Sequence, residues 1–207
     1  MIKRIIFDID DTLIKWKLKY LSALKDTIDA YGLTIDYRKL DGFIEEYESK
    51  YDKYTKKDFL EFINKKFNLD LKEDFLNKWL YEYSFKAEYN EDVYNVLKYL
   101  SKKYELVILS NWFRDNQIAR LKVAKIDKFF NEIYGGDEFI KPNLISFKTA
   151  CGNHKPEECV MVGDSYKIDI EGALKCGLNA IWITKNKKIK KDNLHVIKNI
   201  NEILNIL

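Results

Sequence analysis

The chain has 207 residues, of which 46% are hydrophobic and 33% are charged, with only 8 Gly and 2 Pro. This composition is typical of one globular domain, or of one domain with a sizeable insertion, and it excludes disordered, collagen-like and membrane-spanning chains. The formal charge of +3 is the balance of 36 basic and 33 acidic residues. Such a small and dispersed excess does not indicate a nucleic-acid groove, so we expect no nucleic-acid partner and no membrane partner.

The cysteines and histidines do not have the spacing of a metal site. There are three cysteines (Cys151, Cys159 and Cys176) and two histidines (His154 and His195), without a CxxC pair. A structural zinc site is therefore not expected. The odd cysteine count and an N-terminus without a secretory signal favour a cytoplasmic protein. An enzyme with many carboxylates and so few imidazoles would move protons through acids.

The first part of the chain predicts one strand followed by helices. Residues 2–7 have the pattern of a short buried strand that ends at an acidic cluster. Apolar residues then recur every three or four positions, which is typical of amphipathic helices, over 18–31, 40–47, 59–67 and 71–80. Thr55 with Asp58, and Asp70 with Glu73, have the spacing of capping boxes. We expect the third and fourth helices to begin there.

After Asn90, a suitable N-cap, helical and strand patterns alternate to the end of the chain. Strands are expected over 106–109, 132–134, 160–162, 180–184 and 196–197. This alternation predicts an α/β fold with an open, Rossmann-like parallel sheet and helices on both faces. Residues 1–14 and 88–207 would form the α/β core, and residues 15–87 an inserted all-α helical bundle. The lysine-rich segment 185–191 is interpreted as a surface loop.

Polar side chains follow four of the predicted strands. In an open parallel sheet the carboxyl ends of the strands face the ligand site, so these side chains should meet at one edge. They comprise Asp8, Asp10, Ser110, Asn111, Lys141, Asp164 and Asp169. Carboxylates are the oxygen ligands that Mg²⁺ prefers, and a lysine with hydroxyl and main-chain donors suits phosphoryl oxygens. The sequence therefore predicts a site for magnesium and a phosphate group.

Four motifs in this order resemble those of the haloacid dehalogenase superfamily, a phosphatase-rich group with an aspartyl nucleophile. They are Asp8-Ile-Asp10-Asp-Thr12, Leu109-Ser110-Asn111, Lys141-Pro142, and Gly163-Asp164-Ser165 with Asp169. The similarity extends over the chain apart from the helical segment. That segment resembles, in size and position, the helical cap of the family's first cap class.

The resemblance implies a magnesium-dependent hydrolysis of small phosphomonoesters through an aspartyl phosphate. Asp8 would be the nucleophile, which divides one displacement into two easier steps. Asp10 would protonate the leaving oxygen and then deprotonate the hydrolytic water. Magnesium would be bound by Asp8, by the main-chain carbonyl of Asp10 and by Asp164, and would offset the repulsion between carboxylate and phosphate.

The same resemblance gives roles to the remaining polar residues. Ser110 and the main chain of Asn111 would hold phosphoryl oxygens. Lys141 would neutralise the charge that develops on them. Asp169 would orient Lys141 or a metal-bound water.

Four alternative functions share this fold. Haloacid dehalogenases lack the second aspartate of the first motif, so Asp10 argues against that activity. A phosphonatase needs a Schiff-base lysine in the cap, and no cap lysine stands out. A phosphomutase keeps all four motifs and is only weakly excluded. A catalytically silent binding protein would not need the complete set of polar residues.

The sequence says less about the substrate and the oligomeric state than about the reaction. We expect a small phosphorylated metabolite as partner, and a monomer or homodimer. By their spacing Trp16, Tyr20, Trp79 and Tyr83 are interpreted as bundle core. Trp112 comes directly after Asn111. It is expected either to pack in the core or to contact the cap and the substrate.

Overall fold

The computed structural model describes residues 1–185 and 189–207, apart from the side chains of residues 17 and 18. The segment 185–191, predicted as a surface loop, lies partly outside the described residues. No helix among the described residues is long and apolar enough to cross a membrane.

Six parallel strands form one sheet in the order β3-β2-β1-β4-β5-β6. The strands are β1 (Arg4–Phe7), β2 (Glu105–Leu109), β3 (Glu132–Tyr134), β4 (Cys159–Gly163), β5 (Asn179–Ile183) and β6 (Leu194–Ile197). The central strands β1, β2 and β4 are almost continuous runs of buried apolar residues, which is typical of strands covered on both faces. The predicted parallel sheet is confirmed, and β1 lies at its centre between β2 and β4.

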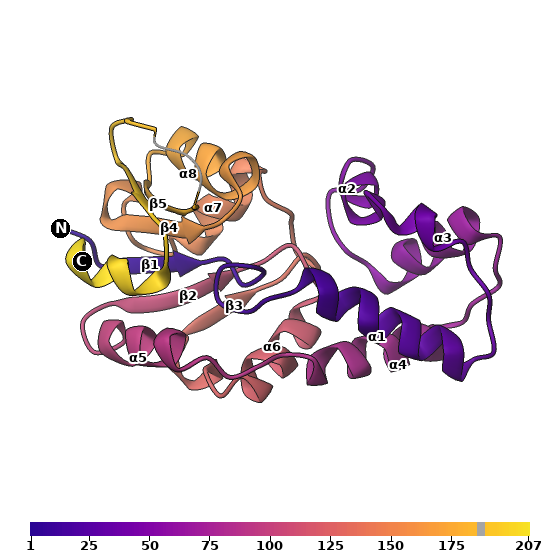
Figure 1. Cartoon of the computed structure of the whole chain (residues 1–207). Coiled ribbons are helices and arrows are strands. Elements are labelled where there is room, and N and C mark those ends of the chain that lie inside the picture. Colours follow the sequence, from indigo (N-terminus) through magenta and orange to yellow (C-terminus); the bar gives the residue numbers. More distant parts are fainter. Residues whose placement is uncertain (186–188) are drawn as a thin grey trace.

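Helices cover both faces of this sheet, as predicted (Figure 1). One face packs against α5 (Glu91–Leu100), α6 (Arg114–Val123) and a C-terminal 3-10 helix (Ile200–Asn205). The other face packs against α7 (Leu144–Ala150) and α8 (Glu171–Lys175). A single π-helical turn (Tyr166–Ile170) precedes α8, and the predicted last helix is 3-10 rather than α. Two further 3-10 turns span Asp127–Phe129 and Pro156–Glu158.

Residues 15–87, called the helical insert below, lie between β1 and α5 in the sequence. They form α1 (Lys17–Ala30), a 3-10 turn (Tyr37–Leu40), α2 (Phe43–Glu48), α3 (Lys56–Phe67) and α4 (Glu73–Phe85). The prediction of one continuous second helix over 40–47 is wrong. Gly42 between the two pieces has φ +64°, a left-handed conformation that ends the first turn and starts α2 in a new direction.

The core of the helical insert is rich in aromatic rings. Tyr47, Phe59 and Trp79 are fully buried there, and Trp112 from the loop after β2 packs among them. The ring centroids of Phe59 and Trp112 lie 5.5 Å apart in an edge-to-face arrangement. Aromatic pairs at this separation attract one another beyond their burial of area, so this contact holds the insert against the sheet.

One of the two predicted helix starts has its side-chain cap, without the reciprocal main-chain bond of a full capping box. The Thr55 hydroxyl accepts a hydrogen bond from the Asp58 main-chain N–H at 3.0 Å, which caps α3. The prediction for Asp70 is wrong, because α4 begins at Glu73 without a side-chain cap. Asn64 instead holds the main chain of Leu71 by hydrogen bonds of 2.8 and 2.9 Å, which fixes the connection before α4.

Replacing the Thr55 cap should weaken the fold measurably. Thr55→Ala is expected to lower the free energy of unfolding by about 1 kcal/mol, because the hydrogen bond to the first turn of α3 is lost. Urea unfolding followed by circular dichroism measures this change. Lys57→Ala, an exposed substitution in the same turn, is the control and should stay within about 0.5 kcal/mol of wild type. Equal stability of the two variants would rule out the capping role.

Candidate active site

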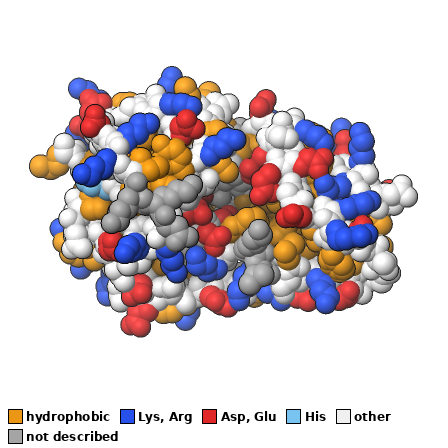
Figure 2. Space-filling model, turned by 45° about the horizontal axis from the view of Figure 1, so that its top comes forward, with side chains coloured by type: hydrophobic (Ala, Val, Ile, Leu, Met, Phe, Trp, Pro, Cys, Tyr) orange, Lys and Arg blue, Asp and Glu red, His pale blue; other side chains and the backbone are white. Residues whose placement is uncertain are grey.

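A cavity of about 300 Å³ lies between the carboxyl ends of the central strands and the helical insert. Asp8, Asp164 and Lys141 line it from the sheet side, whereas Tyr20 and Glu48 line it from the insert. Figure 2 shows this hollow between the two halves of the molecule, with acidic side chains on both sides. Its volume is at the small end of the range for small-molecule sites.

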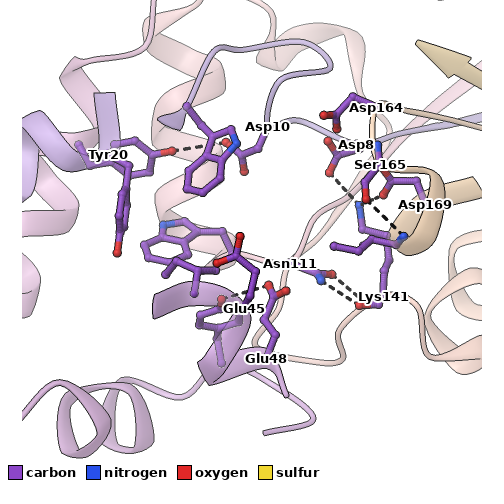
Figure 3. Close-up of a pocket in the computed structure, with 16 residues that line it drawn as sticks. Asp8, Asp10, Tyr20, Glu45, Glu48, Asn111, Lys141, Asp164, Ser165 and Asp169 are labelled. Atoms are coloured by element: carbon purple, nitrogen blue, oxygen red, sulfur yellow. Dashed lines mark hydrogen bonds and ion pairs between the residues drawn. The ribbon is translucent and has the colours of Figure 1, made fainter. Parts of the chain in front are cut away.

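Lys141 joins two buried carboxylates. Its Nζ donates hydrogen bonds of 2.7 Å to Asp8 and of 2.7 Å to Asp169 (Figure 3). The two carboxylates raise the pKa of Lys141 above its usual value against the effect of burial, so the ammonium stays charged. Burial raises the pKa of Asp8 well above its usual value, and Asp169 and Asp10 add to this, while Lys141 opposes it. Only one Asp8 oxygen accepts a hydrogen bond from a described side chain.

The loop after β4 is shaped around Asp169. Its carboxylate accepts a hydrogen bond from the Ser165 main-chain N–H at 3.0 Å, and Ser165 in turn caps the π-helical turn. A Cβ on Gly163 would lie 2.4 Å from an Asp169 oxygen. Only glycine at position 163 therefore lets Asp169 approach the end of β4 and reach Lys141.

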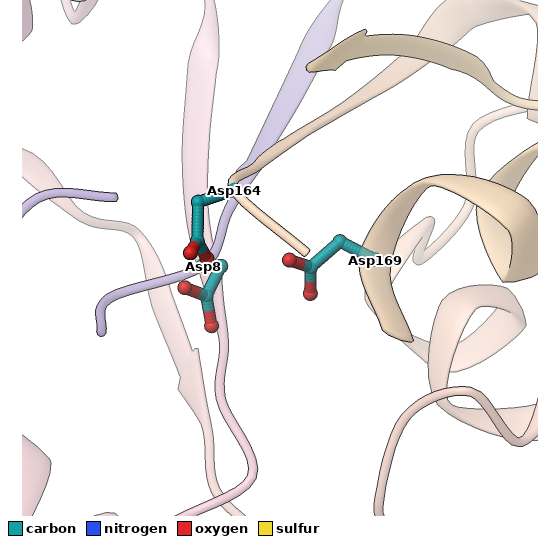
Figure 4. Close-up of side chains that lie close together, drawn as sticks. All are labelled: Asp8, Asp164 and Asp169. Carbon is teal, nitrogen blue, oxygen red and sulfur yellow. The ribbon is translucent and has the colours of Figure 1, made fainter. Parts of the chain in front are cut away.

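Asp8, Asp164 and Asp169 form an acidic cluster whose ligand atoms all lie within 4.8 Å of one another (Figure 4). Burial, followed by the charges of Asp169 and Asp11, raises the pKa of Asp164 to about 6. Among the described side chains, the one ammonium paired with this cluster is that of Lys141, which contacts Asp8 and Asp169 but not Asp164, so an excess of negative charge is left. Oxygen ligands with uncompensated charge fit a hard divalent cation such as Mg²⁺.

The Asp10 carboxyl is fixed by three side chains that sequence reasoning missed. It accepts hydrogen bonds from Arg120 at 2.6 Å, from Gln117 at 2.7 Å and from the Tyr83 hydroxyl at 3.4 Å. Arg120 is fully buried, and its guanidinium carbon lies 4.3 Å from the centre of the Tyr83 ring. Two residues of α6 and one of α4 thus orient Asp10 together, which connects the sheet side of the site to the insert.

Ser110 and Asn111 follow β2 as predicted, but their side chains contact protein groups. The buried Ser110 hydroxyl accepts a hydrogen bond from Gln117 at 2.7 Å, which leaves its proton available to another acceptor. The Asn111 side-chain amide accepts a hydrogen bond from the Lys141 main-chain N–H at 2.7 Å and donates one to the Lys141 carbonyl at 2.9 Å. Asn111 lines the cavity and holds the Lys141 segment in place.

The insert supplies a wall of rings and acids. Tyr20, Trp79 and Tyr83 are buried in the core of the insert, as their spacing predicts, and Trp16 packs against it. Trp16, Tyr20 and Tyr83 also line the cavity, which their spacing does not predict. Trp112 packs against the insert, as one interpretation expected, and it also lines the cavity, whereas contact with a substrate stays a prediction. The acids of this wall are Glu45 and Glu48. Their spacing of three residues on α2 places them on one helix face, which is the signal that could have identified them.

Glu48 should make stability depend on pH. Burial raises its pKa from near 4.5 to about 7, with a small contribution from Glu45, although the hydrogen bond from Tyr54, the nearby Asn111 amide and the charge of Lys141 act against this. Between these pH values the folded protein keeps a proton that the unfolded chain has lost. The free energy of unfolding therefore falls as pH rises from about 4.5 to about 7.

Thermal unfolding of the metal-free protein across this pH range measures the effect. Glu48→Gln should reduce the loss of stability between acidic and neutral pH. Glu46→Gln is the control, because hydrogen bonds from Lys50 and Lys66 lower the pKa of Glu46 to about 2, so it stays ionised throughout. If Glu48→Gln kept the full wild-type pH slope, burial of a titrating Glu48 would be refuted.

The comparisons with known proteins agree with this geometry. A family model described as "Haloacid dehalogenase-like hydrolase" matches residues 5–183. The glyceraldehyde 3-phosphate phosphatase of Methanothermobacter thermautotrophicus is 30% identical over 211 residues, which cover 96% of this chain and 92% of that protein. The pyrophosphatase PpaX of Bacillus mycoides is 26% identical and covers 100% of this chain and 97% of its own length.

A solved structure extends the similarity to the fold. The crystal structure of a HAD phosphatase from Thermococcus onnurineus is 26% identical, with a TM-score of 0.71, and covers 99% of this chain and 97% of that one. The similarity to named phosphatases over most of the chain supports an enzyme of that kind. By the family match, the parallel sheet and the motifs at its strand ends, the chain belongs to the haloacid dehalogenase-like hydrolases.

Proposed function

We propose that this protein is a magnesium-dependent hydrolase of small phosphomonoesters, acting through a phosphoryl group carried on Asp8. The observation that supports it best is the juxtaposition of Asp8, Lys141 and Asp164 at the strand ends, facing a cavity that Asp10 also lines. The similarity to two phosphatases over most of the chain agrees with it.

The residues that would hold Mg²⁺ are Asp8, Asp164 and the main-chain carbonyl of Asp10. The excess negative charge of the acidic cluster supports this assignment. The bound ion would supply the positive charge that lets a carboxylate approach a phosphate dianion.

In the first step an oxygen of Asp8 attacks phosphorus in line with the leaving alcohol oxygen, and the new O–P bond replaces the ester O–P bond. Asp10 gives its proton to the leaving oxygen. In the second step Asp10 takes a proton from water, and the water oxygen attacks phosphorus. The Asp8 O–P bond breaks, which releases inorganic phosphate and restores the Asp8 carboxylate. Arg120 and Gln117 hold the Asp10 carboxyl in one orientation for both transfers.

The phosphoryl oxygens would be held by the Ser110 hydroxyl and by the main chain at Asn111. Lys141 would neutralise the charge that develops on them in the transition state. Asp169 is a positioning residue in this scheme, because its hydrogen bond to Nζ keeps Lys141 directed at the site.

We propose that residues 15–87 are a cap domain over the core formed by 1–14 and 88–207. The cavity lined from both sides supports this division. A cap that closes over the substrate would exclude bulk water from the aspartyl phosphate. A cytoplasmic monomer or homodimer stays a prediction.

Phosphate release tests the proposal. Wild type and Asp8→Asn are compared on a panel of phosphorylated small molecules, with Mg²⁺ and with a chelator. Wild type should release phosphate only with Mg²⁺, and Asp8→Asn should be slower by at least about 1,000-fold. Transfer of phosphate to a second hydroxyl without net release would indicate a phosphomutase, and full activity of Asp8→Asn would exclude the mechanism.

A further inference from the structure

The cavity wall opposite the acidic cluster offers hydrogen-bond acceptors. Glu45 and Glu48 extend from α2 toward the space that Asp8 and Asp164 face (Figure 3). The Tyr54 hydroxyl donates to Glu48 at 3.1 Å. Tyr20 also lines the cavity, and its buried hydroxyl has no hydrogen-bond partner among the described residues. A buried hydroxyl without a partner is costly, so a ligand atom is expected to reach it.

The acids of α2 differ by face. Glu46, which lies on the other side of the helix, pairs with Lys50 at 2.6 Å and also with Lys66. On the cavity face, Glu45 is exposed and Glu48 is half-buried, and neither forms an ion pair with a lysine or arginine whose side chain is described. Among the described lining residues the one cation is Lys141, which is already shared by Asp8 and Asp169.

The pKa values of Glu48 and Tyr20 agree with this shortage of positive charge. Burial raises the pKa of Glu48 to about 7, so the hydrogen bond from Tyr54 and the charge of Lys141 compensate its negative charge only in part. Burial, and then the charge of Glu45, raise the pKa of Tyr20. A cationic ligand would relieve both effects, whereas a neutral ligand would leave the charges as they are.

Aromatic rings surround these acceptors. Trp16, Tyr54 and Trp112 line the same cavity as Tyr20. The centroids of Tyr20 and Trp16 lie 5.6 Å apart, and those of Tyr20 and Trp112 lie 5.9 Å apart, so the rings form a continuous wall. Aromatic faces attract ammonium groups, and carboxylates beside them strengthen that attraction.

We propose that the alcohol half of the substrate carries an ammonium group, bound by Glu45, Glu48 and Tyr20 within this aromatic wall. The substrate class is then a phosphomonoester of a small amino alcohol, an assignment that rests on the proposed function. A cavity of about 300 Å³ has room for a phosphate and a short aminoalkyl chain. A second phosphate or a carboxylate would meet Glu45 and Glu48 and be repelled.

A matched set of substrates tests this inference. The values of kcat/KM are measured for O-phosphoethanolamine, for propyl phosphate, which has a methyl group in place of the ammonium, and for 2-phosphoglycolate, which is anionic. Wild type should prefer the ammonium substrate over propyl phosphate by at least about tenfold, and should use phosphoglycolate worst. Glu45→Gln and Glu48→Gln, alone and together, should reduce this preference, whereas Glu46→Gln should keep it.

The outcomes separate the two proposals. Hydrolysis of propyl phosphate with no preference for the ammonium substrate, or a preference for phosphoglycolate, overturns the amino-alcohol assignment and leaves the hydrolase intact. An ammonium preference that survives in the double variant also overturns it. If none of the three substrates is hydrolysed with Mg²⁺, and p-nitrophenyl phosphate is not hydrolysed either, both proposals are overturned.

Discussion

Lys141→Met should abolish most phosphate release and also destabilise the fold. We expect kcat/KM to fall by about 1,000-fold, because the charge that develops on the phosphoryl oxygens loses its nearest cation. Without metal, the free energy of unfolding at neutral pH should fall by about 3 kcal/mol, since Asp8 and Asp169 are left buried beside each other without an ammonium. Phosphate release and urea unfolding measure the two effects.

The pH dependence of this destabilisation follows from its cause. Burial already raises the pKa of Asp8, so the folded state prefers the protonated acid. Loss of Lys141 removes the group that opposes this shift, and the destabilisation should therefore shrink as pH falls and the carboxyls take up protons. Lys148→Met, an exposed substitution on α7, is the control and should change neither quantity. A stable and active Lys141→Met would contradict the role of the Asp8–Lys141–Asp169 cluster.

Arg120→Met should slow turnover without a matching loss of substrate affinity. Arg120 and Gln117 orient the Asp10 carboxyl, and a misplaced acid/base group costs on the order of 100-fold in rate. We expect kcat to fall by about this factor and KM to change little, because Arg120 is buried behind Asp10 and does not line the cavity.

Three comparisons separate positioning from a loss of folding. Arg120→Lys should recover part of kcat, because it keeps a cation near Asp10. Arg38→Met removes an exposed arginine that pairs only with Asp36 among the described residues, and should leave kcat unchanged. Thermal unfolding shows whether Arg120→Met is folded at the assay temperature. A folded Arg120→Met with wild-type kcat would refute the positioning role.

The sheet was predictable because its strands carry strong local signals. The apolar runs that become β2 and β4 are continuous, and each ends in a polar residue at the edge where parallel strands place ligands. That rule alone brings Ser110 and Asp164 to the same edge as Asp8. The predicted helix over 40–47 failed, although Asp41-Gly42 is a turn dipeptide that argues for a break.

The groups around Asp10 could not be predicted from local patterns. Gln117 and Arg120 stand in a polar helix that has the composition of a solvated face, and both are fully buried. Both side chains are buried with their donor groups against the Asp10 carboxyl. This contact can be recognised only in the folded chain, where α6 packs beside the first motif. Glu45 and Glu48 share a helix face, but the direction of that face depends on the break at Gly42.

Asp8 is the nucleophile in the proposed mechanism, and every other assigned role depends on it. In an acid-quenched single turnover of wild type with Mg²⁺ and an accepted phosphomonoester, mass spectrometry of the peptide that contains Asp8 should detect one added phosphoryl group. It should form and decay at least as fast as kcat, and Asp8→Asn should show neither the adduct nor phosphate release. Turnover without phosphorylation of Asp8, or an adduct on another residue that is retained in Asp8→Asn, would contradict the account.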